Sequence, residues 1–360
     1  MNILILTTHL NKGGVSRYVL NLAIGLKKRG NTVWVASRGG EWVSKLDVEG
    51  VCHRTIPIQT KSICSPKITL SLFNLLPFIK KNNIEIIHSN SRVTQCLGFF
   101  LSKLLKIPYI SAFHGYYRPT IFRKLLKFAG TKTLAVSTAV KQHLIKDLNI
   151  HSDNIFVVYN GIDIKQFSHH SKTKADCGFN ENQFIIGILG RISEEKGHFL
   201  AVRALKSLLS KHKNCYLLLA GTGKMENQLK TLIHQQNLQE NIRFINWKAE
   251  DFLDILDVLI MPSKKEGFGY SIIEAFAKEI PVIGFNVGGI SEIIKDKETG
   301  ILFYSYDEIS LQNAIMDVII NETLKRKIIA AAKERVKIFS LENMAENTEK
   351  VYKTLITVVS

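Results

Sequence analysis

The sequence predicts an α/β protein with two domains, each built on a parallel β-sheet that carries helices on both faces. Short apolar runs alternate with helical patterns in both halves of the chain, which is typical of buried parallel strands connected by helices. The alternation is interrupted over residues 164–183, where the chain turns polar and lacks apolar periodicity. The 360 residues suffice for two domains of ordinary size. We expect domains over residues 1–165 and 166–340, followed by a C-terminal helix over residues 341–360.

Five apolar runs and four helical patterns make up the first domain. The expected strands are Ile3–Leu6, Thr32–Ala36, Ile84–His88, Tyr109–Phe113 and Leu134–Ser137. The expected helices are Ser16–Arg29, Thr69–Lys81, Thr94–Leu105 and Thr138–Leu148. In the second domain, strands are expected at Phe184–Gly190, Cys215–Ala220, Ile242–Ile245, Val258–Met261 and Val282–Phe285. Open parallel sheets bind ligands at the carboxyl ends of their strands, so the loops that follow these runs are the candidate sites.

The composition indicates a globular chain, because 46% of the residues are apolar. No segment approaches the roughly 20 apolar residues that a membrane span requires. The opening residues 1–8 lack a basic region and soon turn polar, so they predict a first buried strand rather than a signal peptide. The five cysteines are scattered, with no Cys-x-x-Cys pair, which favours a reducing compartment. We therefore expect a cytoplasmic protein.

The net charge of +17 is concentrated in the first half of the chain. Residues 1–167 contain 23 Lys/Arg and 7 Asp/Glu, a net of +16, whereas residues 168–360 contain 25 and 24, a net of +1. Such an asymmetry predicts that the first domain faces an anionic surface or substrate. Nucleic acid and anionic lipid headgroups both fit this charge, and a basic face that merely meets solvent is a third alternative.

The most informative segment is Pro262–Glu274, which contains two carboxylates. It follows the apolar run Val258–Met261, and it places Glu266 in a glycine-bearing loop and Glu274 in the helix behind that loop. A strand, a glycine loop and a helix N-terminus in this order present backbone N–H groups to an anion. The carboxylates then lie beside the anion, one placed for sugar hydroxyls and the other for a ribose diol. The segment predicts a nucleotide-sugar site.

The segment Gly190–Gly197 follows the first strand of the second domain and supplies two cations. Arg191 offers a forked set of donors and Lys196 a point charge. The diphosphate of a nucleotide sugar gains negative charge as the glycosidic bond breaks, so these cations can stabilise the leaving group. The next strand is followed by another tight turn, Gly221-Thr-Gly223, which is a weak signal by itself.

Together with Gly288-Gly289, these segments resemble the nucleotide-sugar signature of the family 4 retaining glycosyltransferases. The resemblance covers nearly the whole chain and implies the GT-B fold, in which two Rossmann-like domains face each other across a cleft and the last helix crosses back to the first domain. It also implies an α-linked product from an α-linked donor, and independence of metal ions. The chain has no Asp-x-Asp triplet, so we expect no metal cofactor.

The resemblance implies roles for residues of the second domain. Glu266 resembles the acid at the sugar ring, and Glu274 resembles the acceptor of hydrogen bonds from the ribose. Arg191 and Lys196 match the pair that grips the diphosphate. The further donor-binding positions implied by the family are Gly190, Gly221, Gly223, Gly267, Phe268 and Gly269. The chain departs from the family at Asn246, where a glycine is common, and this leaves the choice of base open.

In the first domain, Gly13, Gly14 and Arg17 match the Gly-Gly-x-x-Arg element of the family, whose glycines let the loop close on the donor. The element is not Gly-x-Gly-x-x-Gly, so a dinucleotide site is unsupported. His114 ends a predicted strand, as does a histidine that lies near the transferred sugar in the family, and we predict that it is catalytic. Asn160, before the linker, is a candidate donor contact.

The segment Tyr116–Phe128 combines apolar and basic residues, and its pattern predicts a helix that begins at Pro119. Its apolar residues are Phe122, Leu125, Leu126 and Phe128, and its cations are Arg123, Lys124 and Lys127. Basic helices with aromatic residues can lie in a membrane interface. A helix packed on its own sheet shows the same pattern, so both interpretations stay open.

We predict a retaining, metal-independent glycosyltransferase that moves a sugar from a nucleotide sugar, expected to be a UDP-sugar, to a hydroxyl of a glycan or lipid-linked acceptor. Cell-surface polysaccharide, lipopolysaccharide or glycolipid synthesis would be its setting, in the cytoplasm or on the inner face of the cytoplasmic membrane. The predicted catalytic residues are His114, Arg191, Lys196 and Glu266. A nucleotide-sugar 2-epimerase of the same fold and a nucleic-acid-binding protein remain as alternatives, although the chain has no nucleic-acid readout motif and no nucleic-acid partner is expected.

Overall fold

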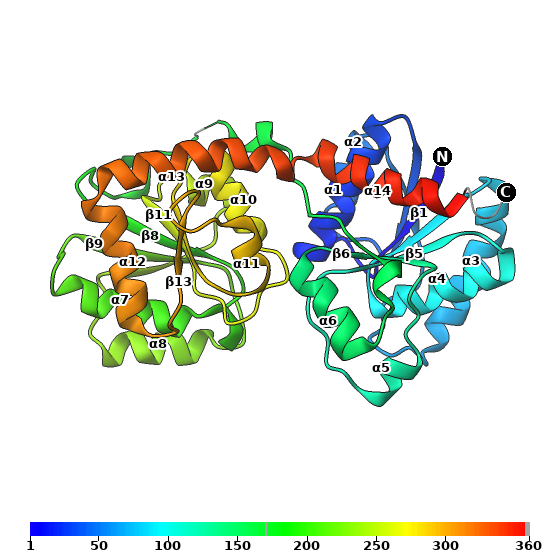
Figure 1. The fold of residues 1–360 in the computed structure, drawn as a ribbon, viewed down its shortest axis with the longest axis horizontal. Coiled ribbons are helices and arrows are strands. Elements are labelled where there is room, and N and C mark those ends of the chain that lie inside the picture. The colour runs from blue at the N-terminus through cyan, green and yellow to red at the C-terminus, as the bar shows by residue number, and fades with distance from the viewer. Residues whose placement is uncertain (170, 357–360) are drawn as a thin grey trace. The chain divides into compact units, whose positions relative to one another are not determined.

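The computed structural model describes residues 1–169 and 171–356, and the chain separates into two compact units (Figure 1). The first unit contains Met1–Ile162 and the chain from Phe339 onward, and the second contains Asp163–Ile338. The chain returns to the first unit beside Ile162, whose N–H donates to the Phe339 carbonyl at 3.0 Å and whose carbonyl accepts from the Leu341 N–H at 2.9 Å. These two hydrogen bonds join the two segments of the first unit where the chain leaves it and returns to it.

The first unit is built on a seven-stranded parallel sheet with the order β3-β2-β1-β4-β5-β6-β7. Its strands are β1 (Asn2–Leu6), β2 (Thr32–Ser37), β3 (Cys52–Thr55), β4 (Ile86–Ser89), β5 (Tyr109–Phe113), β6 (Lys132–Ala135) and β7 (Ile155–Val157). Its helices are α1 (Gly14–Lys28), α2 (Val43–Val48), α3 (Pro66–Lys81), α4 (Arg92–Leu105), α5 (Ile121–Leu125), α6 (Thr138–Leu148) and α14 (Leu341–Ile356). The strand order reverses between β1 and β4, which is where such sheets bind ligands.

The second unit repeats this design with a six-stranded parallel sheet of order β10-β9-β8-β11-β12-β13. Its strands are β8 (Phe184–Leu189), β9 (Cys215–Ala220), β10 (Ile242–Ile245), β11 (Val258–Met261), β12 (Val282–Phe285) and β13 (Ile301–Phe303). Its helices are α7 (His198–Leu209), α8 (Glu226–Gln235), α9 (Ala249–Leu253), α10 (Tyr270–Ala277), α11 (Gly288–Ile293), α12 (Glu308–Ile320) and α13 (Glu322–Arg335). Here the order reverses between β8 and β11.

The predicted α/β class is confirmed, and the apolar runs form strands because both faces of each sheet are covered by helices. Three strands escaped prediction. β3 is an edge strand of mostly exposed polar residues, and β7 and β13 have three residues each. Such segments are too polar or too short to show an apolar run. Local capping fixes where helices begin: Ser91 and Thr94 form a capping box at α4, and Ser137 caps α6, each cap stabilising its helix by about 1 kcal/mol.

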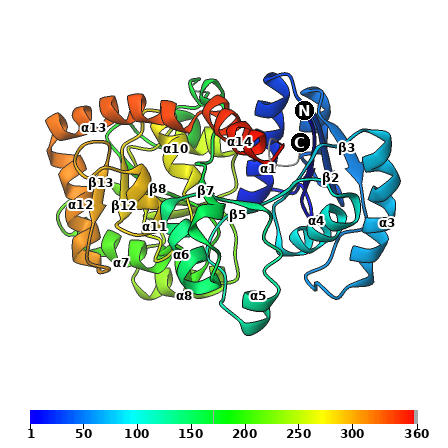
Figure 2. The same ribbon diagram turned by 45° about the vertical axis from the view of Figure 1, so that its right-hand side comes forward.

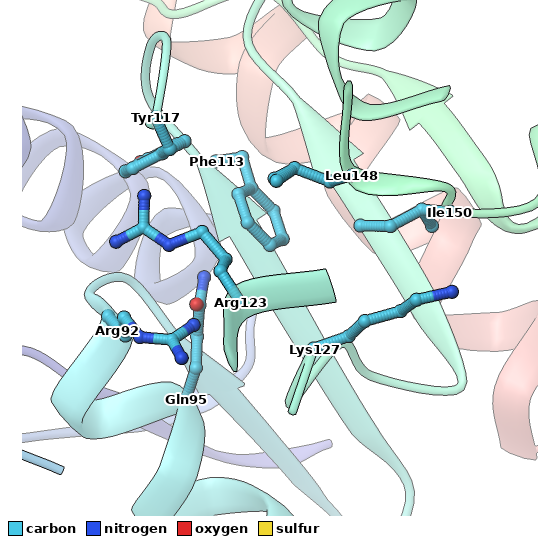
Figure 3. A pocket seen from close by; sticks show the side chains of 8 residues that line it. All are labelled: Arg92, Gln95, Phe113, Tyr117, Arg123, Lys127, Leu148 and Ile150. Carbon is cyan, nitrogen blue, oxygen red and sulfur yellow. The ribbon is translucent and has the colours of Figure 1, made fainter. Parts of the chain in front are cut away.

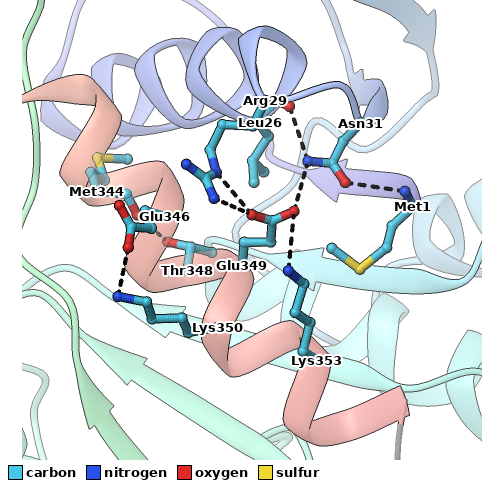
Figure 4. Close-up of polar contacts among 10 residues, drawn as sticks. All are labelled: Met1, Leu26, Arg29, Asn31, Met344, Glu346, Thr348, Glu349, Lys350 and Lys353. Carbon is cyan, nitrogen blue, oxygen red and sulfur yellow. Dashed lines mark hydrogen bonds and ion pairs between the residues drawn. The ribbon is translucent and has the colours of Figure 1, made fainter.

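The terminal helix α14 packs along α1 in the first unit (Figures 1 and 2). The two helices approach closely at Gly25, where an added Cβ would lie 2.8 Å from the Ala345 Cβ. A buried polar network joins them (Figure 4): Glu349 accepts from the Arg29 Nε at 2.8 Å and from the Asn31 Nδ2 at 3.4 Å. Burial raises the pKa of Glu349, but these hydrogen bonds outweigh burial and the net shift is downward. The ionised carboxylate therefore ties the end of the chain to the first unit.

The polar stretch expected to be a linker is instead packed onto the second unit. Phe167, in the 3₁₀ turn Ile164–Phe167, is fully buried. The His169 carbonyl accepts from the buried ammonium of Lys278, which also pairs with Asp254. Further contacts come from Ser171, whose N–H donates to Asp254 at 2.7 Å, and from Lys174, which pairs with Asp257 at 2.7 Å.

The helix expected from Pro119 is much shorter than predicted. It begins at Ile121 and ends at Leu125. Phe128 adopts a left-handed backbone conformation with a φ of 45°, and its ring packs against Phe99 at a centroid distance of 5.7 Å. The helix thus ends at Leu125, and the residues that follow place the Phe128 ring against α4. In the described residues, we find no helix with the length and apolar character needed to span a membrane.

Candidate active site

The strongest candidate site lies at the strand-order reversal of the second sheet. Lys196 ends the loop after β8, Glu266 lies in the loop after β11, and the Lys196 Nζ is 2.5 Å from the Glu266 Oε2. Their side chains are only 25% and 14% exposed, so the ion pair is partly shielded from water. The pairing joins the two segments that the sequence singled out, and it exists because β8 and β11 are neighbours.

Backbone contacts hold the loops of this site together. The Lys264 N–H donates to the Glu195 carbonyl at 2.8 Å, and the Gly289 N–H donates to the Glu266 carbonyl at 3.0 Å. Gly197 has a φ of 74°, and an added Cβ would lie 2.0 Å from the Pro262 carbonyl oxygen. Only glycine fits there, because both the conformation and the space exclude a side chain. The loops after β8, β11 and β12 therefore form one rigid rim.

The other predicted residues of the second unit surround this rim. Arg191 is exposed, and its guanidinium makes no hydrogen bond or ion pair with the part of the chain that the structure describes. Glu274 is buried within α10, which starts just after Gly269. The turn after β9 is tied to the Gly190 loop, because the Gly190 N–H donates to the Ala220 carbonyl and the Ile192 N–H donates to the Thr222 carbonyl. Gly221 and Gly223 flank that turn, and Gly267 and Phe268 are buried in the β11 loop.

Two polar residues beside Lys196 were missed by the sequence analysis. The Oγ of Ser193 is buried and has no partner within residues 1–169 and 171–356. His198 is fully buried with both ring nitrogens unpartnered there, and burial, together with Lys196, lowers its pKa to about 4. His198 is thus a neutral imidazole directly behind the rim. In the sequence, the only feature that points to His198 is its position directly after Gly197.

In the first unit, His114 lies at the carboxyl end of β5 and is held on three sides. Its Nε2 is 3.2 Å from the Asn90 Oδ1, and its backbone N–H donates to the Tyr117 hydroxyl at 3.1 Å. The Tyr18 ring packs edge-on at a centroid distance of 4.5 Å. Burial lowers the pKa of His114 to about 3. The neutral ring therefore donates from Nε2 to Asn90, and its chemistry is that of a hydrogen-bonding group rather than a charged acid.

A fully buried histidine, His88, lies beside the partly buried His114. The His88 Nδ1 is 2.6 Å from the Tyr352 hydroxyl of α14, and its ring is 5.9 Å from that of Tyr18. Burial, reinforced by His114, lowers the pKa of His88 to about 3. Asn90, Tyr18 and His88 were not predicted, although Asn90 carries the recognisable signal of a polar residue at the end of a buried strand.

The remaining predicted residues of the first unit lie near the ends of other strands. Gly13 and Gly14 are exposed in the loop after β1, and Arg17 follows in the first turn of α1. Because Tyr18 is the next residue, the loop is linked directly to His114. Asn160 follows β7 and is buried, and its Oδ1 has no partner in the described residues. The first unit therefore gathers the β1 loop, Asn90 and His114 at its own strand-order reversal.

One solved structure with this fold is a glycosyltransferase from Rickettsia africae. The TM-score is 0.86 and the sequence identity is 27%, over 99% of this chain and 98% of that one. Two parallel α/β sheets of this topology, with polar loops at their strand-order reversals, thus define a glycosyltransferase of the GT-B fold.

Family models match both halves of the chain. The model described as Glycosyltransferase Family 4 matches residues 12–166, and the model described as Glycosyl transferases group 1 matches residues 170–335. The chain belongs to the family 4 glycosyltransferases. One relative is an uncharacterized glycosyltransferase of Methanocaldococcus jannaschii, 27% identical over 95% of this chain and 94% of its own length. Another is the UDP-Gal:alpha-D-GlcNAc-diphosphoundecaprenol alpha-1,3-galactosyltransferase of Escherichia coli, 26% identical over 82% and 81%.

Proposed function

We propose that this glycosyltransferase moves a sugar from a UDP-sugar, with retention of configuration, to a hydroxyl of a glycan or lipid-linked acceptor. The observation that carries the proposal is the Lys196–Glu266 pair at the strand-order reversal of the second sheet. In this proposal the cation binds the diphosphate, and the neighbouring carboxylate binds the sugar hydroxyls. The relative from Escherichia coli is a galactosyltransferase named for a UDP-Gal donor and a diphosphoundecaprenol-linked acceptor, which supports both a UDP-sugar donor and a lipid-linked acceptor here.

In the proposed reaction, Arg191 and Lys196 stabilise the diphosphate as it leaves. The charge on the leaving group grows in the transition state, so cations that are already in place lower the barrier. Glu266 would accept hydrogen bonds from the sugar hydroxyls, and Glu274 from the ribose. His114, being neutral, would donate or accept a hydrogen bond at the reacting sugar without changing its charge. Departure and attack on the same face of the sugar give retention.

The proposed reaction requires no metal ion. Two cationic side chains supply the charge that a divalent ion would otherwise bring to the diphosphate. The sequence also lacks the Asp-x-Asp triplet. Binding of the donor nucleotide should therefore be insensitive to a chelator.

A thermal-shift panel with UDP, GDP, ADP, CMP and TDP, each with and without EDTA, tests the donor site. We expect UDP to raise the Tm in both conditions, because a ligand that binds only the folded state stabilises it. Arg191→Ala should abolish most of the shift. Arg326→Ala, which removes an exposed arginine paired with Glu322 on α13, should leave it intact. A panel in which no nucleotide raises the Tm would refute the proposed function.

We further propose that α5 brings the first unit to an anionic membrane surface. Ile121, Phe122 and Leu125 are 76%, 73% and 74% exposed, whereas Arg123 and Lys124 beside them are half-buried. A soluble helix normally exposes its charges and buries its apolar residues. Exposed apolar side chains with cations at their base instead suit an interfacial helix.

Vesicle sedimentation tests this membrane contact. Replacing Ile121, Phe122 and Leu125 by serine should weaken binding to phosphatidylglycerol vesicles about tenfold or more, since each buried apolar side chain contributes on the order of 1 kcal/mol. The matched control is Ile309→Ser, which changes an exposed isoleucine of the second unit. Equal sedimentation of the triple variant and the control would contradict the membrane contact.

A further inference from the structure

A groove between α3 and α4 in the first unit is not used by the proposed donor chemistry. The two helices lie side by side (Figures 1 and 2), and the groove between them has a volume of about 320 Å³ and opens to solvent. Its walls are formed mainly by Ile63, Ile68, Leu72 and Phe100, and no lining residue is a lysine, arginine or acid. Small-molecule sites in proteins have volumes of about 300–1,000 Å³, so the groove has room for a small apolar group.

The surface around the groove is also apolar. Leu70 and Phe73 on α3 and Phe100 and Leu104 on α4 are all exposed. Among the described residues, eight of the fourteen exposed large apolar side chains lie between positions 70 and 126. Soluble proteins rarely expose a large apolar surface unless it binds something. The groove is therefore a hollow in an apolar face that requires a partner.

This apolar surface continues to α5. The Phe100 ring, which lines the groove, lies 6.2 Å from the Phe128 ring, measured between centroids. Phe128 follows the last residue of α5, Leu125, by three positions. One wall of the groove is thus in direct contact with the segment that we propose to meet a membrane, where hydrocarbon chains are available.

The charges near the groove favour an anionic amphiphile. Residues 50–146 contain fifteen Lys/Arg and a single acid, Glu85. Lys61 and Lys67 flank the lining residues on the α3 side, and Lys103 follows Phe100 by about one turn of α4. None of these three lysines pairs with a carboxylate in the part of the chain that the structure describes. A second copy of this surface would bring like charges together, whereas an anionic headgroup would neutralise them.

The groove lies close to the carboxyl edge of the sheet, where His114 follows β5. α4 begins at Arg92, directly after the carboxyl end of β4. Cys96, which lines the groove, is one turn into α4, about 6 Å along the helix axis from Arg92. Asn90 precedes α4 by two residues, and its Oδ1 is 3.2 Å from the His114 Nε2. One helical turn and a short loop therefore connect the groove with the partner of His114.

We propose that this groove holds the first part of the hydrocarbon chain of a lipid-linked acceptor that carries an anionic headgroup. The inference rests on the proposed glycosyltransferase function and assigns a binding site to the chain of its acceptor. The apolar walls pack against the chain, and the three unpaired lysines attract the phosphate groups that join the chain to the sugar. The rest of the chain stays in the membrane, and the acceptor sugar lies toward His114.

The thiol of Cys64 gives a direct readout, because it is exposed and lines the groove. Farnesyl phosphate, kept below its micelle concentration, should slow the alkylation of Cys64 by N-ethylmaleimide at least fivefold, since the bound chain covers the thiol. Cys52 is exposed on β3 outside the lining, so its alkylation rate should stay unchanged. Inorganic phosphate should protect neither thiol. Equal alkylation rates of Cys64 with and without farnesyl phosphate would overturn the proposal.

Two tryptophan variants on α3 separate the groove from the apolar surface around it. Thr69 lines the groove, so Thr69→Trp fills it and should weaken farnesyl phosphate binding, measured by calorimetric titration, at least tenfold. Leu70→Trp places the same ring at the next position, which is exposed and outside the lining, and should change the affinity less than threefold. Circular dichroism checks that both variants are folded. Equal losses in the two variants, or no loss in either, would contradict the groove site.

Further arms of the test identify other occupants. Phosphatidylglycerol vesicles that protect Cys64 where farnesyl phosphate does not would assign the groove to membrane phospholipids. Protection that rises with protein concentration in the absence of lipid would assign it to a second copy of the chain. Either result overturns the acceptor assignment. The UDP thermal shift reports on the donor site alone, so its absence from a wild-type protein that binds farnesyl phosphate would refute the donor site and not the groove.

Discussion

Lys196→Ala is expected to lower kcat for sugar transfer by about 100-fold while leaving the protein folded. Removing one preorganised group that stabilises charge in a transition state typically costs a factor of about 10² to 10³. Lys196 is anchored for that role by the carboxylate of Glu266 at 2.5 Å and by the rigid Gly197 turn. The charge on the diphosphate grows during bond cleavage, so the loss should appear mainly in kcat rather than in KM.

The control for this prediction is Lys264→Ala. Lys264 is an exposed lysine of the neighbouring loop, and its backbone N–H bond to the Glu195 carbonyl does not depend on the side chain. The kcat of Lys264→Ala should stay within about threefold of the wild-type value, because substitutions of exposed side chains usually have small effects. Similar kcat values for Lys196→Ala and Lys264→Ala would remove Lys196 from the mechanism.

A double-mutant cycle with Glu266→Gln extends the argument. If the two side chains act as one unit, the double variant should lose less activity than the product of the two single losses. Fully multiplicative losses would mean that the ion pair is present but that each residue contributes independently. Chemical denaturation of the four proteins separates effects on folding from effects on rate.

The segments of the proposed donor site could be singled out from the sequence because each of them carries a local signal. Gly190–Gly197 and Pro262–Glu274 each combine a buried strand, a glycine-bearing loop and a helix start. The Lys196–Glu266 contact could not be predicted from the sequence. It depends on β8 and β11 being neighbours, while β9 and β10 lie on the other side of β8. Strand order is a property of the whole sheet, and no local pattern encodes it.

The same limit applies to the first unit. His114 was predicted as a site residue because it follows an apolar strand. Its partner Asn90 follows a different strand, so the sequence alone does not show that the two residues meet. Arg92 of α4 and Arg123 of α5 line one small cavity (Figure 3), which forms only because β4 and β5 are paired. For α5, the sequence pattern predicted a longer helix than the structure contains. The helix ends at Leu125, and Phe128 packs against Phe99 and Phe100 instead of continuing it.

Acidification from pH 7.5 to pH 5.5 is expected to lower the unfolding free energy of the first unit by about 3 kcal/mol. Burial lowers the folded-state pKa of both His88 and His114 to about 3, whereas an unfolded chain titrates near 6.5. The unfolded state thus binds more protons over this interval, and stability rises with pH. Each histidine contributes about 1.4 kcal/mol between these two pH values, and the contribution is complete above pH 6.5.

The pH window of this effect, not its sign, distinguishes the histidines from the carboxylates. Glu349 has a lowered pKa, so the stability that it contributes is lost only as the pH falls below its unfolded value near 4.5. The window between pH 7.5 and 5.5 therefore reports on histidines alone. His198, with its pKa lowered to about 4, adds the same dependence to the second unit.

Denaturant unfolding at the two pH values, followed by a probe in the first unit, measures the prediction. His114→Gln should reduce the pH-dependent difference by about 1.4 kcal/mol, because one histidine with a strongly lowered pKa is gone. The exposed His151→Gln serves as the control and should leave the difference unchanged. Comparing two pH values within each variant cancels any general loss of stability caused by the substitution itself. An unaltered pH difference in His114→Gln would mean that the folded protein does not hold His114 as a neutral ring, and its proposed role as an uncharged hydrogen-bonding group at the sugar would be refuted as well.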